Sequence, residues 1–132
     1  MPDTFLAIDF DGTICEHGKY PEVGDPVPAA LTWLERFKAA GAHFILWTCR
    51  DSYALGVALQ YLHGNGVEVV GVNENPDQKS WSKSPKAYAH LYIDDAAIGC
   101  PLIYPEDRRP YVDWSIVGPE VLEFLDRRKY SE

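Results

Sequence analysis

Cysteine, basic charge and long apolar runs are all scarce in this chain. The three cysteines, at positions 15, 49 and 100, are odd in number, widely spaced and without a CxxC pair. This pattern favours reduced thiols and disfavours a disulfide framework or a cysteine-ligated metal. No segment approaches the roughly 20 apolar residues that cross a bilayer. The acidic stretch Met1–Thr4 does not have the composition of a signal peptide, so we expect a cytoplasmic protein without membrane association.

Acidic residues outnumber basic ones, with 20 Asp and Glu against 12 Lys and Arg and a formal net charge of −8. This charge disfavours binding to anionic membranes and to long nucleic acid, although a phosphorylated nucleic-acid end stays open as a ligand. The 132 residues, 46% of them hydrophobic, suit a single folded domain over residues 1–132.

Apolar runs alternate with amphipathic ones along the chain. We expect a first strand that begins at Phe5. Four further strands are expected at His43–Thr48, Val67–Val72, Leu91–Ile93 and Tyr111–Val117. We expect a helix from Pro28 to a cap at Gly41 and a second one that Asp51 or Ser52 caps and that ends near Gly64. Two more are expected at Pro85–Tyr88 and Pro119–Lys129, with loops at residues 14–27 and 73–84 and irregular chain at 100–110. The alternation predicts an α/β fold: a doubly wound parallel sheet in three layers, with helices on both faces.

The segment Asp9-Phe10-Asp11-Gly12-Thr13 follows the first expected strand. Residues two apart on a strand point to the same face, so Asp9 and Asp11 converge while Phe10 turns into the core. Gly12 then allows a sharp bend. Because ligands bind beyond the carboxyl ends of strands in an open parallel sheet, this turn is the first candidate site.

Other polar residues are expected at the same rim of the sheet. Thr48 follows the second strand, Lys86 begins a short helix, and Asp94-Asp95 end the 91–93 strand. Taken singly, each has a common structural explanation as a turn, a cap or a solvated charge. Together, clustered carboxylates repel by roughly 4 kcal/mol per pair at ~4 Å and an effective dielectric of ~20, so they need a proton or a cation. Ligands that are all oxygen favour magnesium over zinc.

In combination, these residues resemble the four motifs of the haloacid dehalogenase (HAD) superfamily, over nearly the whole chain. The resemblance implies a Rossmann-type fold and a phosphatase, that is, a phosphoric monoester hydrolase that forms an aspartyl-phosphate. It makes Asp9 the nucleophile and Asp11 the general acid and base. It implies a Mg²⁺ ion held by Asp9, the backbone carbonyl of Asp11, Asp94 and Asp95.

The resemblance also implies roles for two further residues. Thr48 would bind a phosphoryl oxygen, and Lys86 would neutralise the nucleophile and the phosphate; Lys79 and Lys83 are alternatives for the lysine. Only 14 residues separate Thr13 from Pro28, and 12 separate Val72 from Pro85, too few for the cap domain that such enzymes usually insert. We therefore expect a small uncapped member of the HAD superfamily with an open cleft. A second subunit of a homo-oligomer is one way in which this cleft could be closed.

The resemblance implies a substrate that is a phosphorylated small molecule or an accessible phosphate on a larger partner. Candidate substrate-binding residues are Gly12, Thr13, His17 and Arg50, and the entrance is expected to include Glu16, Lys19, Tyr20, Asn73, Asn75 and Trp81. Arg50 has two interpretations, a bidentate contact with a substrate anion or an ion pair with Asp51 or another acid. For His17 the alternative is an exposed loop histidine.

Two other functions compete with hydrolysis. A response-regulator receiver also joins acids, Thr and Lys on such a sheet with magnesium, but it carries its adjacent acid pair after the first strand. In this chain the adjacent pair, Asp94-Asp95, comes late. The second alternative is a catalytically silent domain that keeps the fold and binds phosphate or metal.

Overall fold

The computed structural model describes residues 3–130; Met1 and Pro2, part of the N-terminal stretch considered above, lie outside them. The elements in chain order are β1 (Thr4–Ile8), α1 (Ala30–Ala39), β2 (Ala42–Leu46), α2 (Ser52–Gly64), β3 (Val69–Val72), the 3₁₀ helix η1 (Pro76–Ser80), β4 (Leu91–Ile93), β5 (Leu102–Ile103), β6 (Tyr111–Val112) and α3 (Trp114–Lys129). None of the helices in this part of the chain has the length and apolarity needed to span a membrane.

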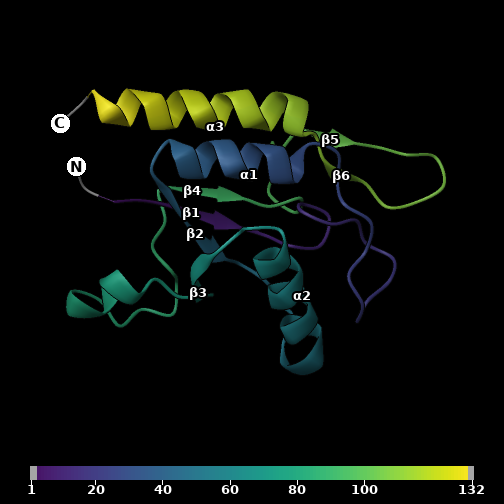
Figure 1. Cartoon of the computed structure of the whole chain (residues 1–132), viewed down its shortest axis with the longest axis horizontal. Helices are drawn as coiled ribbons and strands as arrows, with labels where there is room; N and C mark the ends of the chain where they lie inside the picture. The colour runs from purple at the N-terminus through teal and green to yellow at the C-terminus, as the bar shows by residue number, and fades with distance from the viewer. Residues whose placement is uncertain (1–2, 131–132) are drawn as a thin grey trace.

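Four parallel strands form the main sheet in the order β3-β2-β1-β4, which confirms the expected α/β fold with a parallel sheet (Figure 1). β1 pairs with β2 through Ile8 and Leu46 and with β4 through Ile8 and Ile93. The chain moves from β1 to β2 to β3 in one direction and then crosses back to place β4 on the other side of β1. The order in which strands are added therefore changes direction between β1 and β4.

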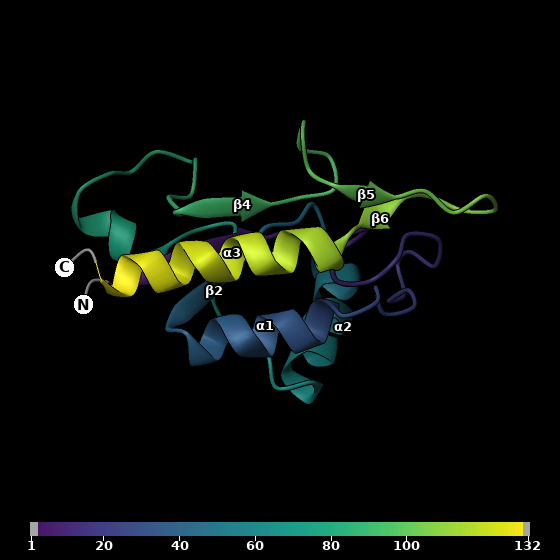
Figure 2. The same ribbon diagram turned by 90° about the horizontal axis from the view of Figure 1, so that it is seen from above.

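One face of the sheet carries the larger hydrophobic core. Alternate residues of β1, Leu6 and Ile8, lie in it with Phe44 and Leu46 of β2. All three α-helices contribute to this cluster, through residues that include Leu34, Phe37, Ala58, Leu62, Val121 and Leu125. Helices α1 and α3 lie side by side in both views (Figures 1 and 2).

The opposite face carries a smaller cluster of Phe5, Ala7, Ile45 and Ala89, none of them helical. The expected helix at Pro85–Tyr88 is absent, so the sequence prediction was wrong there. In its place, the segment from β3 to β4 contains η1, which the sequence analysis treated as loop.

The side chain of Gln78 explains why residues 85–88 are not helical. Its amide nitrogen donates to the Lys86 carbonyl at 2.9 Å, and its amide oxygen accepts from the Tyr88 N–H at 2.8 Å. The backbone groups that a helix would pair internally are thus used by a side chain of η1.

Residues 100–117 also differ from expectation. Leu102–Ile103 forms a strand where irregular chain was expected, and it pairs antiparallel with Tyr111–Val112, the start of the expected last strand. The strand expected to run to Val117 ends early because Asp113 caps α3, its carboxylate accepting from the Ser115 N–H at 3.1 Å. Helix α3 consequently begins at Trp114 and includes Pro119.

Gly118 tests the packing of α3 on α1. A Cβ at Gly118 would overlap the indole of Trp33, so we expect Gly118→Ala to lower the free energy of unfolding by about 1–3 kcal/mol. Urea denaturation followed by circular dichroism measures the change. The control is Gly56→Ala in α2, where an added methyl meets open space and alanine should be neutral or stabilise by up to about 1 kcal/mol. Wild-type stability in Gly118→Ala would contradict the close helix contact.

Candidate active site

The acidic residues gather at the carboxyl ends of β1 and β4. The Asp9 N–H donates to the Ile93 carbonyl at 2.9 Å, so Asp9 lies directly beside the start of the Asp94-Asp95 pair. This is the point where the order of adding strands changes direction, and ligands of open α/β sheets bind at such points.

Asp9, Asp94 and Asp95 form an acidic triad, with one carboxylate oxygen from each residue all within 4.8 Å of one another. Burial raises the pKa of Asp9 to about 8, and a hydrogen bond with Asp95 and the charge of Asp94 act in the same direction. Burial also raises the pKa of Asp94. Converging oxygen ligands in a partly buried site suit a hard divalent cation.

Thr13 contacts two members of this triad and is not accessible to a substrate. Thr13 is fully buried, and its hydroxyl donates to Asp9 Oδ2 at 2.9 Å. The Thr13 hydroxyl oxygen also accepts from the Asp95 N–H at 3.3 Å. Its carbonyl accepts from the indole N–H of Trp114 at 2.8 Å. The structure therefore corrects the predicted substrate contact: Thr13 is a scaffold residue of the acidic triad.

Gly12 and His17 lie against the acidic triad. His17 Nε2 and Asp95 Oδ2 are 2.8 Å apart, and both side chains are largely buried. Gly12 has a φ of 82°, and a Cβ at this position would overlap both of those atoms. Glycine is therefore required twice here, for the backbone conformation and for the close approach of the His17–Asp95 pair.

Arg50 pairs with Asp11 through two parallel hydrogen bonds, and Asp51 is not its partner. Its Nε and one Nη each lie 2.8 Å from an oxygen of the Asp11 carboxylate. The Arg50 side chain is 1% exposed and that of Asp11 is 22% exposed. The bidentate contact expected with a substrate anion is thus made inside the protein, and it raises the pKa of Arg50.

The remaining Arg50 donors bind backbone carbonyls. One Nη donates to Pro21 at 2.7 Å and Ala54 at 2.9 Å, and the other donates to Glu22 at 3.1 Å. All five N–H groups of the guanidinium are then used, so none is left for a substrate. Arg50 ties Asp11 to the loop at residues 14–27 and to α2.

Thr48 lies at the rim of the cleft, fixed by Asn73. The Thr48 N–H donates to Asn73 Oδ1 and the Thr48 carbonyl accepts from Asn73 Nδ2, both at 2.8 Å. Asn73 has the left-handed φ of 56° that asparagine tolerates. The Thr48 hydroxyl oxygen accepts from the Arg50 N–H at 3.1 Å, which leaves its hydrogen free to donate.

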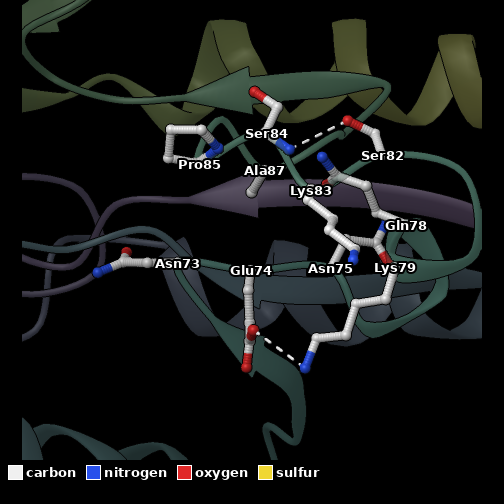
Figure 3. A pocket seen from close by; sticks show the side chains of 10 residues that line it. All are labelled: Asn73, Glu74, Asn75, Gln78, Lys79, Ser82, Lys83, Ser84, Pro85 and Ala87. Carbon is white, nitrogen blue, oxygen red and sulfur yellow. Dashed lines mark hydrogen bonds and ion pairs between the residues drawn. The ribbon is translucent and has the colours of Figure 1, made fainter.

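No lysine makes an ion pair with the acidic triad within residues 3–130. The ammonium of Lys86 lies 5.8 Å from the ring centre of Tyr92, and Lys79 pairs with Glu74 at 3.5 Å. Lys83 lines a separate pocket (Figure 3).

A cleft of about 660 Å³ contains most of the predicted residues. Its lining consists of Asp9, Asp11, His17, Gly18, Tyr20, Thr48, Cys49, Arg50, Asp94, Asp95, Ala96 and Arg109. Among these, sequence reasoning missed Arg109, which belongs to the loop between β5 and β6. The available signal was the pair Arg108-Arg109 in an otherwise acidic chain.

No family model matches this chain, and no curated protein matches it significantly. A solved structure of a conserved protein from Bacteroides thetaiotaomicron is similar, with a TM-score of 0.75 and 29% sequence identity over 93% of each chain.

The acidic triad should make stability depend on pH in the metal-free protein. The pKa of Asp9 is about 8 in the folded chain against its ordinary value of 3.8, so the folded state binds the extra proton between these values. The resulting stabilisation is complete below pH 4 and is lost as the pH rises through 8. We expect Asp9→Asn to flatten this profile and to exceed wild type by about 1–3 kcal/mol at pH 9.

Urea denaturation in a chelating buffer at pH 5, 7 and 9 measures this effect. Asp126→Asn is the matched control, because Asp126 is an exposed carboxylate on α3 that pairs with Lys129. It should keep the wild-type profile. If the free energy of unfolding of Asp9→Asn varied with pH as that of wild type does, Asp9 would not be the source of the pH dependence.

The Arg50 contacts predict a large structural effect. Arg50→Ala leaves the Asp11 carboxylate and three carbonyls without their donor, so we expect a loss of roughly 3 kcal/mol in the free energy of unfolding. Arg50→Lys keeps the positive charge but lacks the planar guanidinium that makes two parallel hydrogen bonds, so it should recover only part of the lost stability. The control Arg127→Ala removes only an exposed pair and should change the denaturation midpoint little. Equal midpoints for Arg50→Ala and Arg127→Ala would contradict the assignment.

Proposed function

We propose that this protein is a magnesium-dependent phosphohydrolase that cleaves a phosphate monoester through an aspartyl-phosphate on Asp9. The observation that carries the proposal is the convergence of Asp9, Asp94 and Asp95 within 4.8 Å at the carboxyl ends of neighbouring strands. The resemblance of these residues, with Asp11 and Thr48, to the HAD motifs supports the same reaction.

We further propose that the chain is a small uncapped member of the HAD superfamily with its doubly wound, three-layer arrangement. The strand order β3-β2-β1-β4 supports this, because the order of adding strands changes direction beside β1. The segment between β3 and β4 would take the place of a helical layer on the face of Phe5 and Ile45.

Asp9, Asp94, Asp95 and the backbone carbonyl of Asp11 would hold the Mg²⁺ ion. The donor set fits this ion because every ligand is an oxygen. Burial, with the neighbouring Asp95 and Asp94 acting in the same direction, raises the pKa of Asp9 to about 8, so the ionised triad is unfavourable without a cation. When bound, the ion offsets the repulsion between a carboxylate nucleophile and a phosphate and stabilises the charge of the transition state.

The reaction has two displacements at phosphorus. An oxygen of Asp9 attacks phosphorus, and the bond to the leaving oxygen breaks as Asp11 donates a proton to that oxygen. Asp11 then takes a proton from a water molecule that attacks the aspartyl-phosphate, which releases inorganic phosphate and restores Asp9.

Four other residues support these steps. Thr13 fixes one oxygen of Asp9, and Arg50 orients the carboxylate of Asp11. The free hydroxyl hydrogen of Thr48 donates to a phosphoryl oxygen. At the mouth of the cleft, Arg109 supplies the positive charge that the sequence analysis assigned to Lys86.

Hydrolysis of p-nitrophenyl phosphate with and without Mg²⁺ tests the proposal. We expect slow magnesium-dependent turnover that Asp9→Asn abolishes, because no nucleophile remains. Asp11→Asn should lower kcat by about 10²–10⁴ through loss of acid–base catalysis. It should retain Mg²⁺ affinity in calorimetry, since Asp11 offers the ion only a backbone carbonyl. The exposed variant Asp126→Asn should match wild type in both measurements.

Normal turnover by Asp9→Asn would remove it as the nucleophile, and loss of Mg²⁺ binding in Asp11→Asn would contradict the ligand assignment. A screen of phosphorylated metabolites, nucleotides and oligonucleotides with 3′- or 5′-phosphate ends would identify the leaving group. Mg²⁺ binding without hydrolysis of any of them would favour the catalytically silent domain.

A further inference from the structure

His17 is the one histidine among the residues that line the active-site cleft, and it contacts a carboxylate of the acidic triad. Its Nε2 lies 2.8 Å from Asp95 Oδ2, and the two side chains are 16% and 15% exposed. An ionised carboxylate oxygen can only accept a hydrogen bond, so Nε2 carries the hydrogen and donates it. The single N–H of the neutral imidazole is thus used inside the protein and is not offered to a substrate.

Contacts of the preceding residue fix the backbone that leads to His17. The Glu16 N–H donates to the Asp25 carbonyl at 2.7 Å. The Glu16 carboxylate, 12% exposed, accepts from Arg108 Nε at 2.6 Å. These contacts tie together the loop at residues 14–27 and the loop between β5 and β6, which both extend beyond the same end of the sheet (Figures 1 and 2). The loop therefore sets the place of the imidazole before any ligand arrives.

The turn after β1 leaves room for the contact only because residue 12 has no side chain. A Cβ at Gly12 would overlap both His17 Nε2 and Asp95 Oδ2. Glycine at this position therefore lets the imidazole and the carboxylate meet against the backbone of the turn that carries Asp9 and Asp11.

The other two carboxylates of the acidic triad are held in the same way. The hydroxyl of Thr13 donates to Asp9 Oδ2 at 2.9 Å. The Ala96 N–H donates to Asp94 Oδ1 at 2.9 Å. With His17 as the donor to the third carboxylate, each member of the triad has one oxygen fixed by the protein and a second oxygen available to an ion.

We propose that His17 is a positioning residue that orients the Asp95 carboxylate for Mg²⁺ and so raises the affinity of the site for the ion. Hydrogen bonds to the ligands of a metal ion fix their direction before the ion binds, and loss of one commonly lowers metal affinity by about 10–100-fold. In this role His17 does not touch the substrate. The identity of the ion rests on the proposed function, but the positioning role does not require hydrolysis.

Isothermal titration calorimetry with Mg²⁺ at about pH 8 tests this role without catalysis. His17→Phe keeps a planar ring and removes the donor, so we expect its Kd for Mg²⁺ to be about tenfold higher. His17→Gln can place an amide N–H near the position of Nε2 and should restore most of the affinity. The control His63→Phe changes an exposed histidine in the last turn of α2 and should match wild type. Wild-type affinity in His17→Phe, or equal losses in His17→Phe and His17→Gln, would overturn the proposal.

NMR of the imidazole nitrogens supplies a measurement that needs no variant. In the wild-type protein with saturating Mg²⁺ we expect the Nε2–H tautomer of His17, because the hydrogen bond to Asp95 selects it. Its proton should exchange slowly with water. The Nδ1–H tautomer would overturn the proposal.

Hydrolysis of p-nitrophenyl phosphate separates positioning from a substrate contact. Higher Mg²⁺ concentrations should restore the kcat of His17→Phe, and its KM at saturating Mg²⁺ should match wild type. A KM that stays raised at saturating Mg²⁺ would make His17 a substrate contact instead. Weaker Mg²⁺ binding by His17→Phe, without hydrolysis by any form of the protein, would overturn the proposed function and keep the positioning role. Absence of Mg²⁺ binding in wild type would overturn both.

Discussion

Repulsion among three carboxylates at the ends of β1 and β4 is the constraint on which the rest of the site depends. The parallel pairing of Ile8 with Ile93 places Asp9 beside Asp94 and Asp95, so the sheet itself creates the concentration of charge. The protein offsets it in part through the Thr13 hydroxyl and the His17 imidazole. The negative charge that these two groups do not compensate favours binding of a cation.

The sequence predicted the parts of the site that depend on local geometry. Asp9 and Asp11 are two residues apart at the end of an apolar strand, and Asp94-Asp95 end another, so strand periodicity and parallel order were sufficient to bring them to one edge. The requirement for glycine at position 12 followed from the bend, although the overlap with His17 and Asp95 became visible only in three dimensions.

Contacts between distant segments could not be predicted in this way. From the sequence alone, Arg50 could pair with any of several acids. In the structure, hydrogen bonds to the carbonyls of Pro21, Glu22 and Ala54 hold the guanidinium where it pairs with Asp11. Lys86 was expected near the acids because a helix was expected at residues 85–88. That helix does not form, since the Gln78 side chain hydrogen-bonds the backbone of this segment. Arg109 lies in a hairpin loop without hydrophobic periodicity, so the adjacent basic pair Arg108-Arg109 was a signal of its presence but not of which way it faces.

The pair of hydrogen bonds between Asn73 and Thr48 has a consequence for energetics. These bonds fix the backbone of Thr48 at the rim of the cleft, so the entropy of ordering this residue is lost on folding and not on binding of a ligand. A single asparagine in a left-handed conformation would thus preorganise the hydroxyl of Thr48 for the phosphoryl contact proposed above.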